Sequence, residues 1–199
     1  MTTTFFLVRH AAHPLLGRVL VGRAGGISLA EQGREQANQL ARRFAEEHIT
    51  AVQSSPRERA RETAVPIAAV TGVPLEIAAA LDEVDVGEWA GRAFAELNGD
   101  PRWETWNTQR GLACTPGGET MHDVRERIVA HLDQLRTTYP QGKIVLVTHG
   151  DVIKGAVLHY LGLPLDDYQR IEVEPASVST IEIGDWGSKI AALNEKVRA

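Results

Sequence analysis

Two histidines in this 199-residue chain stand directly after apolar runs, and arginines accompany them. Arg9-His10 follows one run, His149-Gly150 follows another, and Arg59 lies near the start of a helical pattern. A neutral imidazole nitrogen can attack phosphorus, and guanidinium groups stabilise the charge on the phosphate oxygens. Nearby cations would lower the pKa of His10 and keep it unprotonated. If these side chains converge, the chemistry that they favour is phosphoryl transfer through a phosphohistidine.

The apolar runs themselves predict how the two histidines meet. Residues 4–8 and 143–147 are continuous in Phe, Leu, Ile and Val, which is typical of strands covered on both faces. Each run ends just before one of the histidines. Because ligands of open α/β sheets bind at the carboxyl ends of the strands, His10 and His149 are expected in one crevice.

Arg59 belongs to a helix predicted to run to about residue 71. Ser55 is expected as its N-cap and Pro56 at its first helical position. Helical spacing places Arg59 on the flank opposite Arg57 and Arg61, which better fit ordinary surface positions. Arg59 is therefore available for the crevice.

The remaining pattern predicts a three-layer αβα sandwich with a mostly parallel central sheet, forming a single domain over residues 1–199. An excursion of helices and loops at about residues 84–117, which gathers most of the tryptophans, would act as a cap over the strand ends. Three further helices are expected: one that starts at a capping box of Ser28 and Glu31 and ends near Glu47, one that starts after Pro116–Thr120 and ends near Thr138, and one from Asp151 to Leu161. Two further strands are expected at 50–53 and 73–77, and a terminal hairpin is expected to pair 177–183 with 189–193.

Composition narrows the possible partners and location. The formal charge is −5 and the pI is about 5.8, which argues against nucleic acid or an anionic membrane surface as a partner. Cys114 is the only cysteine, so an intrachain disulfide is impossible and a reducing compartment is favoured. The chain has no run of 18 apolar residues and no basic start typical of a signal peptide. A cytoplasmic protein is expected, with its oligomeric state left open.

Three segments together resemble the signature of a known family. They are Leu7–His10, Ser54–Ala64 and Val147–Gly150, in this order and at these strand and helix positions. This combination is similar to the histidine phosphatase superfamily, with its phosphoglycerate mutase-like fold. Two further stretches, Leu81–Gly91 and Pro116–Thr120, resemble the family's proton-donor segment and the turn before its next helix. The resemblance spans essentially the whole chain.

The resemblance implies a role for each matching residue. His10 would be the nucleophile that becomes phosphorylated, and Glu83 would protonate the leaving oxygen and later activate the water. Arg9, Arg59 and His149 would hold the phosphate, with the backbone N–H of Gly150 in reach. The substrate would be a small phosphate ester, and neither a metal nor another cofactor is implied.

The sequence departs from the family just after the catalytic histidine. The family usually has glycine there, whereas this chain has Ala11-Ala12-His13. His13 could contact the substrate or only cap the loop before Pro14. Arg23 lies where relatives place substrate contacts, so it is a candidate for recognising a second anionic group. Trp103 and Trp106 are either packing residues or part of a lid.

Several alternatives compete with these interpretations. Without the flanking motifs, the two histidines would be ordinary strand-end residues, and His10 with His13 could be half of a metal site that lacks its other ligands. A phosphatase is the leading hypothesis, and a cofactor-dependent phosphoglycerate mutase is the alternative. A non-catalytic phosphate- or protein-binding module is the third. Arg92, Arg102 and Arg110 are scattered where mutases of the family carry a basic segment, so the phosphatase is preferred.

Overall fold

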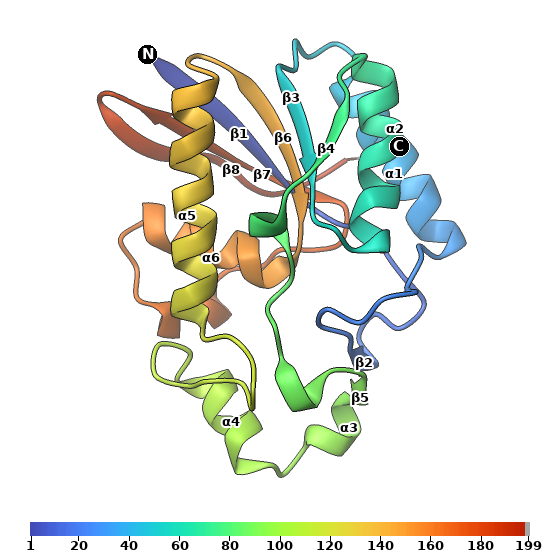
Figure 1. The fold of residues 1–199 in the computed structure, drawn as a ribbon, viewed down its shortest axis with the longest axis vertical. Coiled ribbons are helices and arrows are strands. Elements are labelled where there is room, and N and C mark those ends of the chain that lie inside the picture. Colours follow the sequence, from blue (N-terminus) through green and yellow to red (C-terminus); the bar gives the residue numbers. More distant parts are fainter. Residues whose placement is uncertain (198–199) are drawn as a thin grey trace.

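A six-stranded sheet runs through the computed structural model, which describes residues 1–197 (Figure 1). The strands lie in the order β4 (Leu75–Ile77), β3 (Ala51–Ser54), β6 (Lys143–Thr148), β1 (Thr2–Arg9), β7 (Ser177–Gly184) and β8 (Gly187–Lys196). β4, β3, β6 and β1 pair in parallel, and β7 and β8 join at one edge through antiparallel pairing, so the prediction of a mostly parallel sheet between helical layers is confirmed.

The two strands that precede the histidines are neighbours at the centre of this sheet. β1 and β6 pair in parallel with Arg9 opposite Thr148, so His10 and His149 follow at the same edge. Successive side chains of β1 point to opposite faces. Phe5 and Leu7 pack in the core beneath α5 (Met121–Thr138) and α6 (Gly150–Tyr160), and Phe6 and Val8 pack in the core beneath α1 (Glu31–Phe44) and α2 (Glu58–Thr71). Burial on both faces explains the continuous apolar run.

Two helices start later than the sequence predicts. Helix α1 begins at Glu31, and Ser28 does not cap it. The reason is that the preceding segment is extended, with the N–H of Leu29 donating to Glu62 and that of Ala30 donating to the carbonyl of Ala12. This helix also ends at Phe44, before the predicted Glu47.

Helix α2 begins at Glu58, so the predicted start at Ser55 and Pro56 is wrong. The hydroxyl of Ser55 lies close to a histidine and a carboxylate of the site described below. The prediction of the end of α2 at Thr71 is confirmed. Arg57, assigned to the surface from helical spacing, is half-buried and paired with Asp82. Because α2 starts later than predicted, Ser55 and Arg57 lie before the helix, where their side chains contact residues of the site.

The excursion lies beyond the carboxyl ends of the parallel strands, at the bottom of Figure 1. A two-stranded antiparallel sheet joins it to the loop that follows His10. Trp89 and Trp106 are fully buried there and pack edge to face. The tryptophans thus serve packing, although Trp103 and Trp106 also line the cavity described below. The elements of the excursion are η2 (Gly87–Trp89), β5 (Arg92–Ala93), α3 (Phe94–Leu97) and α4 (Pro101–Thr108). Around it, β2 (Val19–Leu20) belongs to the loop that follows His10, η1 (Ala79–Leu81) precedes the excursion, and η3 (Leu165–Arg170) follows α6.

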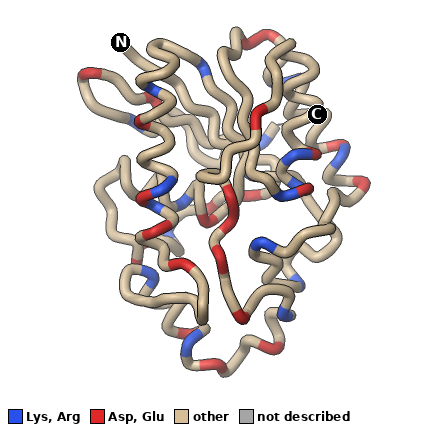
Figure 2. Tube along the Cα trace, in the orientation of Figure 1, with Lys and Arg blue, Asp and Glu red and all other residues tan. Residues whose placement is uncertain are grey.

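Charged residues of both signs are interspersed along the trace (Figure 2). The segment after η1 and the start of η2 are locally acidic, with Asp82, Glu83, Asp85 and Glu88 in close succession. Within residues 1–197, no helix combines the length and the apolar character that crossing a membrane requires.

Gly33 gives a test of how α1 supports the loop after His10. A Cβ atom on Gly33 would lie 2.0 Å from the carbonyl oxygen of Ala12. Gly33→Ala is expected to lower the free energy of unfolding by about 1–3 kcal/mol through overpacking. At a solvent-exposed position in a helix, the same replacement would instead stabilise the protein by about 1 kcal/mol, because alanine has the higher helix propensity. Thermal unfolding followed by circular dichroism measures the change. The control is Gln32→Ala on the exposed face of α1, and a Tm of Gly33→Ala at or above that of the parent would contradict the predicted clash.

Candidate active site

His10 lies at the end of β1, with a ring that is only 3% exposed. Its Nδ1 is 2.9 Å from the carbonyl oxygen of Ala11. A carbonyl can only accept, so Nδ1 carries the hydrogen and Nε2 keeps its lone pair. Arg59 Nε is 3.4 Å from that Nε2. Burial, followed by the charges of Arg59 and Arg9, lowers the pKa of His10 well below its usual value, so the ring is neutral at pH 7 and Nε2 has a lone pair that can act as a nucleophile.

His149 lies at the end of β6 and is held by a chain of hydrogen bonds. Arg59 Nη2 is 3.3 Å from its Nδ1, and because arginine can only donate, Nδ1 is the acceptor. The Nε2–H then donates to Ser55 Oγ at 2.7 Å, and Ser55 can donate to Asp82 Oδ1 at 3.4 Å. Burial lowers the pKa of His149 well below its usual value, with the charge of Arg59 as a further cause. The chain fixes the ring 5.2 Å from that of His10, centroid to centroid.

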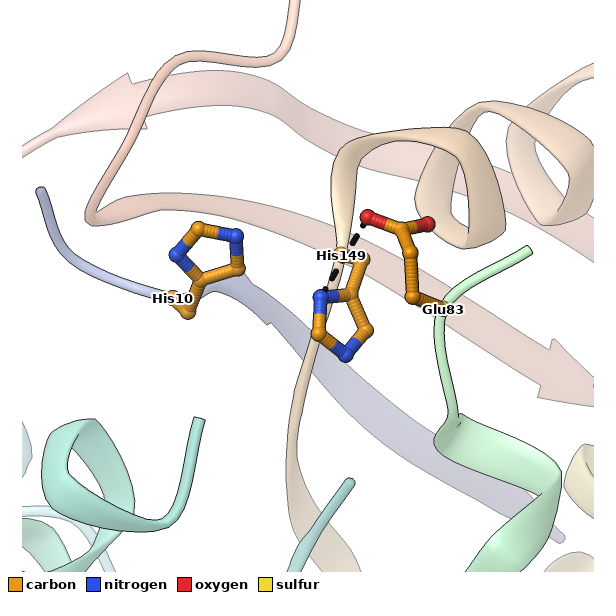
Figure 3. Close-up of side chains that lie close together, drawn as sticks. All are labelled: His10, Glu83 and His149. Carbon is orange, nitrogen blue, oxygen red and sulfur yellow. Dashed lines mark ion pairs between the residues drawn. The ribbon is translucent and has the colours of Figure 1, made fainter. Parts of the chain in front are cut away.

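Glu83 completes this group, and Figure 3 shows its carboxyl group pointing at the ring of His149. Its Oε2 is 3.4 Å from His149 Nδ1, and its side chain is 15% exposed. Burial and the charge of Asp151 raise the pKa of Glu83 to about 7, against the opposing charge of Arg59. A carboxyl group with this pKa is present in both protonation states near neutral pH. It can therefore give and take a proton, as acid–base catalysis requires.

The buried Arg59 and the partly buried Arg9 make the space between the rings attractive to anions. Arg59 is 1% exposed, and among residues 1–197 its Nη1 has no hydrogen-bond partner. Arg9 donates from Nη1 to the carbonyl oxygen of Val173 at 2.6 Å, and within the same described part of the chain its Nε is unpartnered. Helix α6 begins at Gly150, so its free N–H groups and the positive end of its dipole face the same region. Unsatisfied cationic donors of this kind fit a bound phosphate.

His10, Glu83 and His149 also lie close enough together to hold a metal ion. Ligand atoms of His10, Glu83 and His149 lie within 4.8 Å of one another. Arg59 donors stand 3.3 and 3.4 Å from the ring nitrogens that would bind the ion, so a divalent cation would meet a fixed positive charge. The electrostatics therefore fit an anion better than a metal.

A network of backbone anchors holds Glu83 beside His149. Thr148 donates from its hydroxyl to the carbonyl oxygen of Leu81 at 2.6 Å, which ties the end of β6 to the segment carrying Glu83. Arg23 and Arg127 both donate to the carbonyl oxygen of Glu83, at 2.8 and 3.2 Å. Arg57 pairs with the neighbouring Asp82 at 2.9 Å. The sequence did not predict that Thr148, Arg57 and Arg127 belong to the site, because their roles depend on contacts with residues distant in the sequence.

The network also settles where Arg23 lies. Its guanidinium group forms ion pairs with Glu119 at 2.9 Å, Asp82 at 3.5 Å and Asp85 at 3.6 Å. Arg23 is not among the residues that line the cavity. The structure thus places it behind Glu83, as a support, and not where it would recognise a second anionic group.

A cavity of about 490 Å³ opens between these groups and the excursion. His13 lines it, 7% exposed, with its ring centroid 5.4 Å from that of His10. Burial, with the charges of Arg59 and Arg9, lowers the pKa of His13 to about 4, so this ring is neutral. The cavity also contains Arg110 and Lys154, which sequence analysis did not assign to the site. The spacing of four residues between Gly150 and Lys154 was an available signal, since such residues share a helix face.

Known proteins resemble this chain in sequence and in fold. The model of the histidine phosphatase superfamily (branch 1) matches residues 5–196. Phosphoserine phosphatase 1 of Hydrogenobacter thermophilus is 28% identical over 193 residues, covering 94% of this chain and 90% of that protein. A probable phosphoglycerate mutase of Escherichia coli is 30% identical over 182 residues, covering 89% of this chain and 83% of that protein. The structure of a mycobacterial glucosyl-3-phosphoglycerate phosphatase has the same fold, with a TM-score of 0.89, 24% identity, and coverage of 98% of this chain and 100% of that chain.

Proposed function

Because the chain belongs to the histidine phosphatase superfamily, we propose that it is a phosphatase that hydrolyses a small phosphomonoester through a phosphohistidine intermediate. The main support for this mechanism is the state of His10: its ring is neutral and buried, and the lone pair of Nε2 lies beside Arg59. His10 is the proposed nucleophile. Arg9, Arg59, His149 and the N–H of Gly150 are proposed to bind the phosphate, and His13 to contact the rest of the substrate.

In the first half of the reaction, His10 Nε2 attacks phosphorus and the ester P–O bond breaks. The electron pair leaves on the alcohol oxygen, which takes a proton from Glu83. Arg9 and Arg59 stabilise the charge on the other phosphate oxygens as the group transfers. The products of this step are the alcohol, phosphohistidine and the carboxylate of Glu83.

In the second half, the carboxylate of Glu83 takes a proton from water and the oxygen attacks phosphorus. The P–N bond breaks, its electron pair returns to Nε2 of His10, and phosphate leaves. A pKa of about 7 suits Glu83 to both steps, since each needs a different protonation state at the same pH. None of these proton transfers requires a metal or another cofactor.

The mutase is the second candidate, favoured by the relative named a probable phosphoglycerate mutase. A mutase must return the phosphoryl group to a second hydroxyl, whereas a phosphatase gives it to water. Of Arg92, Arg102 and Arg110, which are scattered where mutases of the family carry a basic segment, Arg92 and Arg102 do not line the cavity, so that segment adds little positive charge to bind a bisphosphate. The phosphatase is therefore preferred.

A phosphate-release screen over a panel of metabolites tests this function. The protein, dialysed against EDTA, is given each ester, including 2- and 3-phosphoglycerate with and without 2,3-bisphosphoglycerate. We expect stoichiometric phosphate release from at least one ester, at a rate that EDTA changes less than about twofold, because the proposed reacting groups are all side chains. Isomerisation of phosphoglycerate without phosphate release would favour the mutase. Loss of activity with EDTA, restored by a divalent ion, would contradict the metal-independent mechanism.

The partner that we propose is a small soluble phosphate ester, with neither nucleic acid nor membrane as a partner. Lys and Arg residues are interspersed with Asp and Glu residues along the trace (Figure 2), and the formal charge of the chain is −5. A cytoplasmic location is also proposed, on the basis that the only cysteine, Cys114, is a free and exposed thiol compatible with a reducing compartment.

A further inference from the structure

His149 needs a hydrogen on Nδ1 if it is to bind a phosphate. Nδ1 is the ring nitrogen on the side of the proposed phosphate site, 3.3 Å from Arg59 Nη2 and 3.4 Å from Glu83 Oε2, to which the dashed line in Figure 3 joins it. In this arrangement Nδ1 accepts from Arg59 and therefore carries no hydrogen. The oxygens of a phosphate dianion can only accept. Phosphate binding therefore requires a change in the protonation of His149.

Ser55 determines which change is possible. Its hydroxyl oxygen is buried and accepts from the Nε2–H of His149 at 2.7 Å and from the backbone N–H of Arg57 at 3.3 Å, which uses both of its lone pairs. The hydrogen of the hydroxyl group is therefore directed to Asp82 Oδ1, 3.4 Å away. A hydroxyl group oriented in this way has no hydrogen to donate to Nε2, so Nε2 keeps its own. His149 then gains a hydrogen on Nδ1 only by becoming an imidazolium ion.

Asp82 keeps the hydroxyl group of Ser55 in this orientation. It is 7% exposed and accepts from Arg57 Nη2 at 2.9 Å and from the backbone N–H of Glu83 at 2.8 Å, which fixes the carboxylate with Oδ1 towards Ser55. A buried carboxylate at one end of a hydrogen-bond chain stabilises positive charge on a histidine in the same chain, as it does in Ser-His-Asp triads. The chain from His149 through Ser55 to Asp82, called the relay below, therefore suits an imidazolium.

The cations around His149 decide when it takes up the proton. Burial lowers the pKa of His149 well below its usual value, with the charge of Arg59 as a further cause, so the ring by itself is neutral. A phosphate dianion between Arg9 and Arg59 would offset their charges and attract an imidazolium, so the proton is expected to enter together with the anion. The charged and titratable groups that face the ring are Arg9 and His10 at the end of β1, Arg59 on α2, Glu83 after η1 and Arg127 on α5, whereas Asp151 on α6 accepts from Tyr168.

We propose that Asp82 is a positioning residue that acts through Ser55, keeping the hydrogen of His149 on Nε2 so that phosphate binds only together with one additional proton on Nδ1. The proposal rests on the proposed function, because it places the phosphate between His10 and His149. The proton comes from the P–OH group of an ester monoanion, or from the solvent when the ester arrives as a dianion, and it adds to the lone pair of Nδ1. It leaves again with the inorganic phosphate, and no other bond changes in this step.

Long-range proton–nitrogen NMR spectra report the hydrogen on each ring nitrogen of a histidine and test the proposal directly. Sulfate is the probe, because it is a tetrahedral dianion like phosphate but has no proton to give near neutral pH. The spectra are recorded at about pH 5.5, where Glu83, with a pKa of about 7, keeps its proton with and without sulfate. The parent should show a neutral His149 with its hydrogen on Nε2, and an imidazolium when sulfate is in excess. His149→Gln identifies the signals.

Two variants interrupt the relay in different ways. Ser55→Ala removes the hydroxyl group, and Asp82→Asn removes the charge but keeps an oxygen that can accept from the N–H of Glu83. In both, His149 should stay neutral with sulfate bound, and the Kd of sulfate should rise about tenfold, as expected for loss of one charge-assisted hydrogen bond. Ser55→Thr retains the hydroxyl group and should restore the imidazolium. The matched control is Asp133→Asn, an exposed carboxylate on α5, which should behave as the parent does.

Three results would overturn the proposal. They are a His149 ring that stays neutral in the parent with excess sulfate, an imidazolium in Ser55→Ala with sulfate bound, and an imidazolium already present in the parent without sulfate. These spectra need no turnover, so they are independent of the reaction. Absence of phosphate release from every ester of the screen, with proton uptake as expected, would contradict the proposed function alone. Phosphate release without proton uptake by His149 would contradict the relay alone.

Discussion

Replacing His10 with alanine is expected to lower kcat for phosphate release by about 10⁴-fold or more, because the variant has no side chain to form the covalent intermediate. The change in KM should be much smaller. Arg9, Arg59 and the start of α6, which would bind the phosphate, all remain in place. The measurement is steady-state phosphate release with the best ester from the screen.

A chemical readout separates loss of the nucleophile from loss of structure. Parent protein quenched during turnover with labelled substrate should carry an acid-labile, base-stable phosphate, as expected for phosphohistidine, and His10→Ala should carry none. His48→Ala is the control. This exposed histidine precedes β3 at the amino end of the sheet, opposite the site, and its replacement should leave kcat and labelling unchanged. Phosphate release by His10→Ala at more than a tenth of the parent rate would rule out the mechanism.

Replacing Glu83 with glutamine should slow both halves of the reaction, since an amide neither gives nor takes the proton. With an alkyl phosphate we expect kcat to fall by about 10²–10⁴-fold, the usual contribution of acid–base catalysis. With p-nitrophenyl phosphate, whose leaving group needs no proton, the variant should release one equivalent of nitrophenol rapidly and then stall as phosphohistidine. A merely structural role for Glu83 would slow both esters equally, with no burst.

The pH dependence follows from the pKa of Glu83, which burial raises to about 7. The fraction of protonated Glu83 falls as pH rises through 7, so phosphorylation of the parent by an alkyl ester should slow above pH 7. In Glu83→Gln this decline should disappear. The control is Glu88→Gln, an exposed carboxylate that pairs only loosely with Arg102 at 3.6 Å, which should keep the parent profile.

Replacing Glu83 with glutamine should raise stability at alkaline pH although it lowers activity. A carboxyl group whose pKa is higher in the folded protein binds its proton more tightly when folded, so its stabilising effect is complete below the unfolded pKa of about 4.5 and is lost as pH rises through about 7. Because glutamine does not titrate, Glu83→Gln removes this loss of stability at high pH. We expect its Tm to exceed that of the parent at pH 8 and to approach it at pH 5. A Tm below that of the parent at pH 8 would show that burial of Glu83 does not cost stability.

The sequence predicted the central strands and the arrangement of a sheet between helical layers. These features depend on local periodicity, which an apolar run such as 143–147 carries in its own residues. Helix starts were predicted less well. Ser55 has the local pattern of an N-cap, but its hydroxyl is taken by His149, a contact between residues 94 positions apart. Long-range partners of this kind are invisible to a local pattern.

The functional site was also predicted from the sequence only in part. The motifs around Arg9-His10, Arg59 and His149-Gly150 identified the residues that converge, because each motif is tied to the end of a strand or the start of a helix. Only the tertiary structure decided the proton positions on His10 and His149, since these depend on which donors and acceptors surround each ring. It also decided that Arg23 supports Glu83 from behind while Arg110 reaches the cavity. Both are arginines in irregular segments of the chain, and what separates them is packing against distant elements, which the sequence alone does not express.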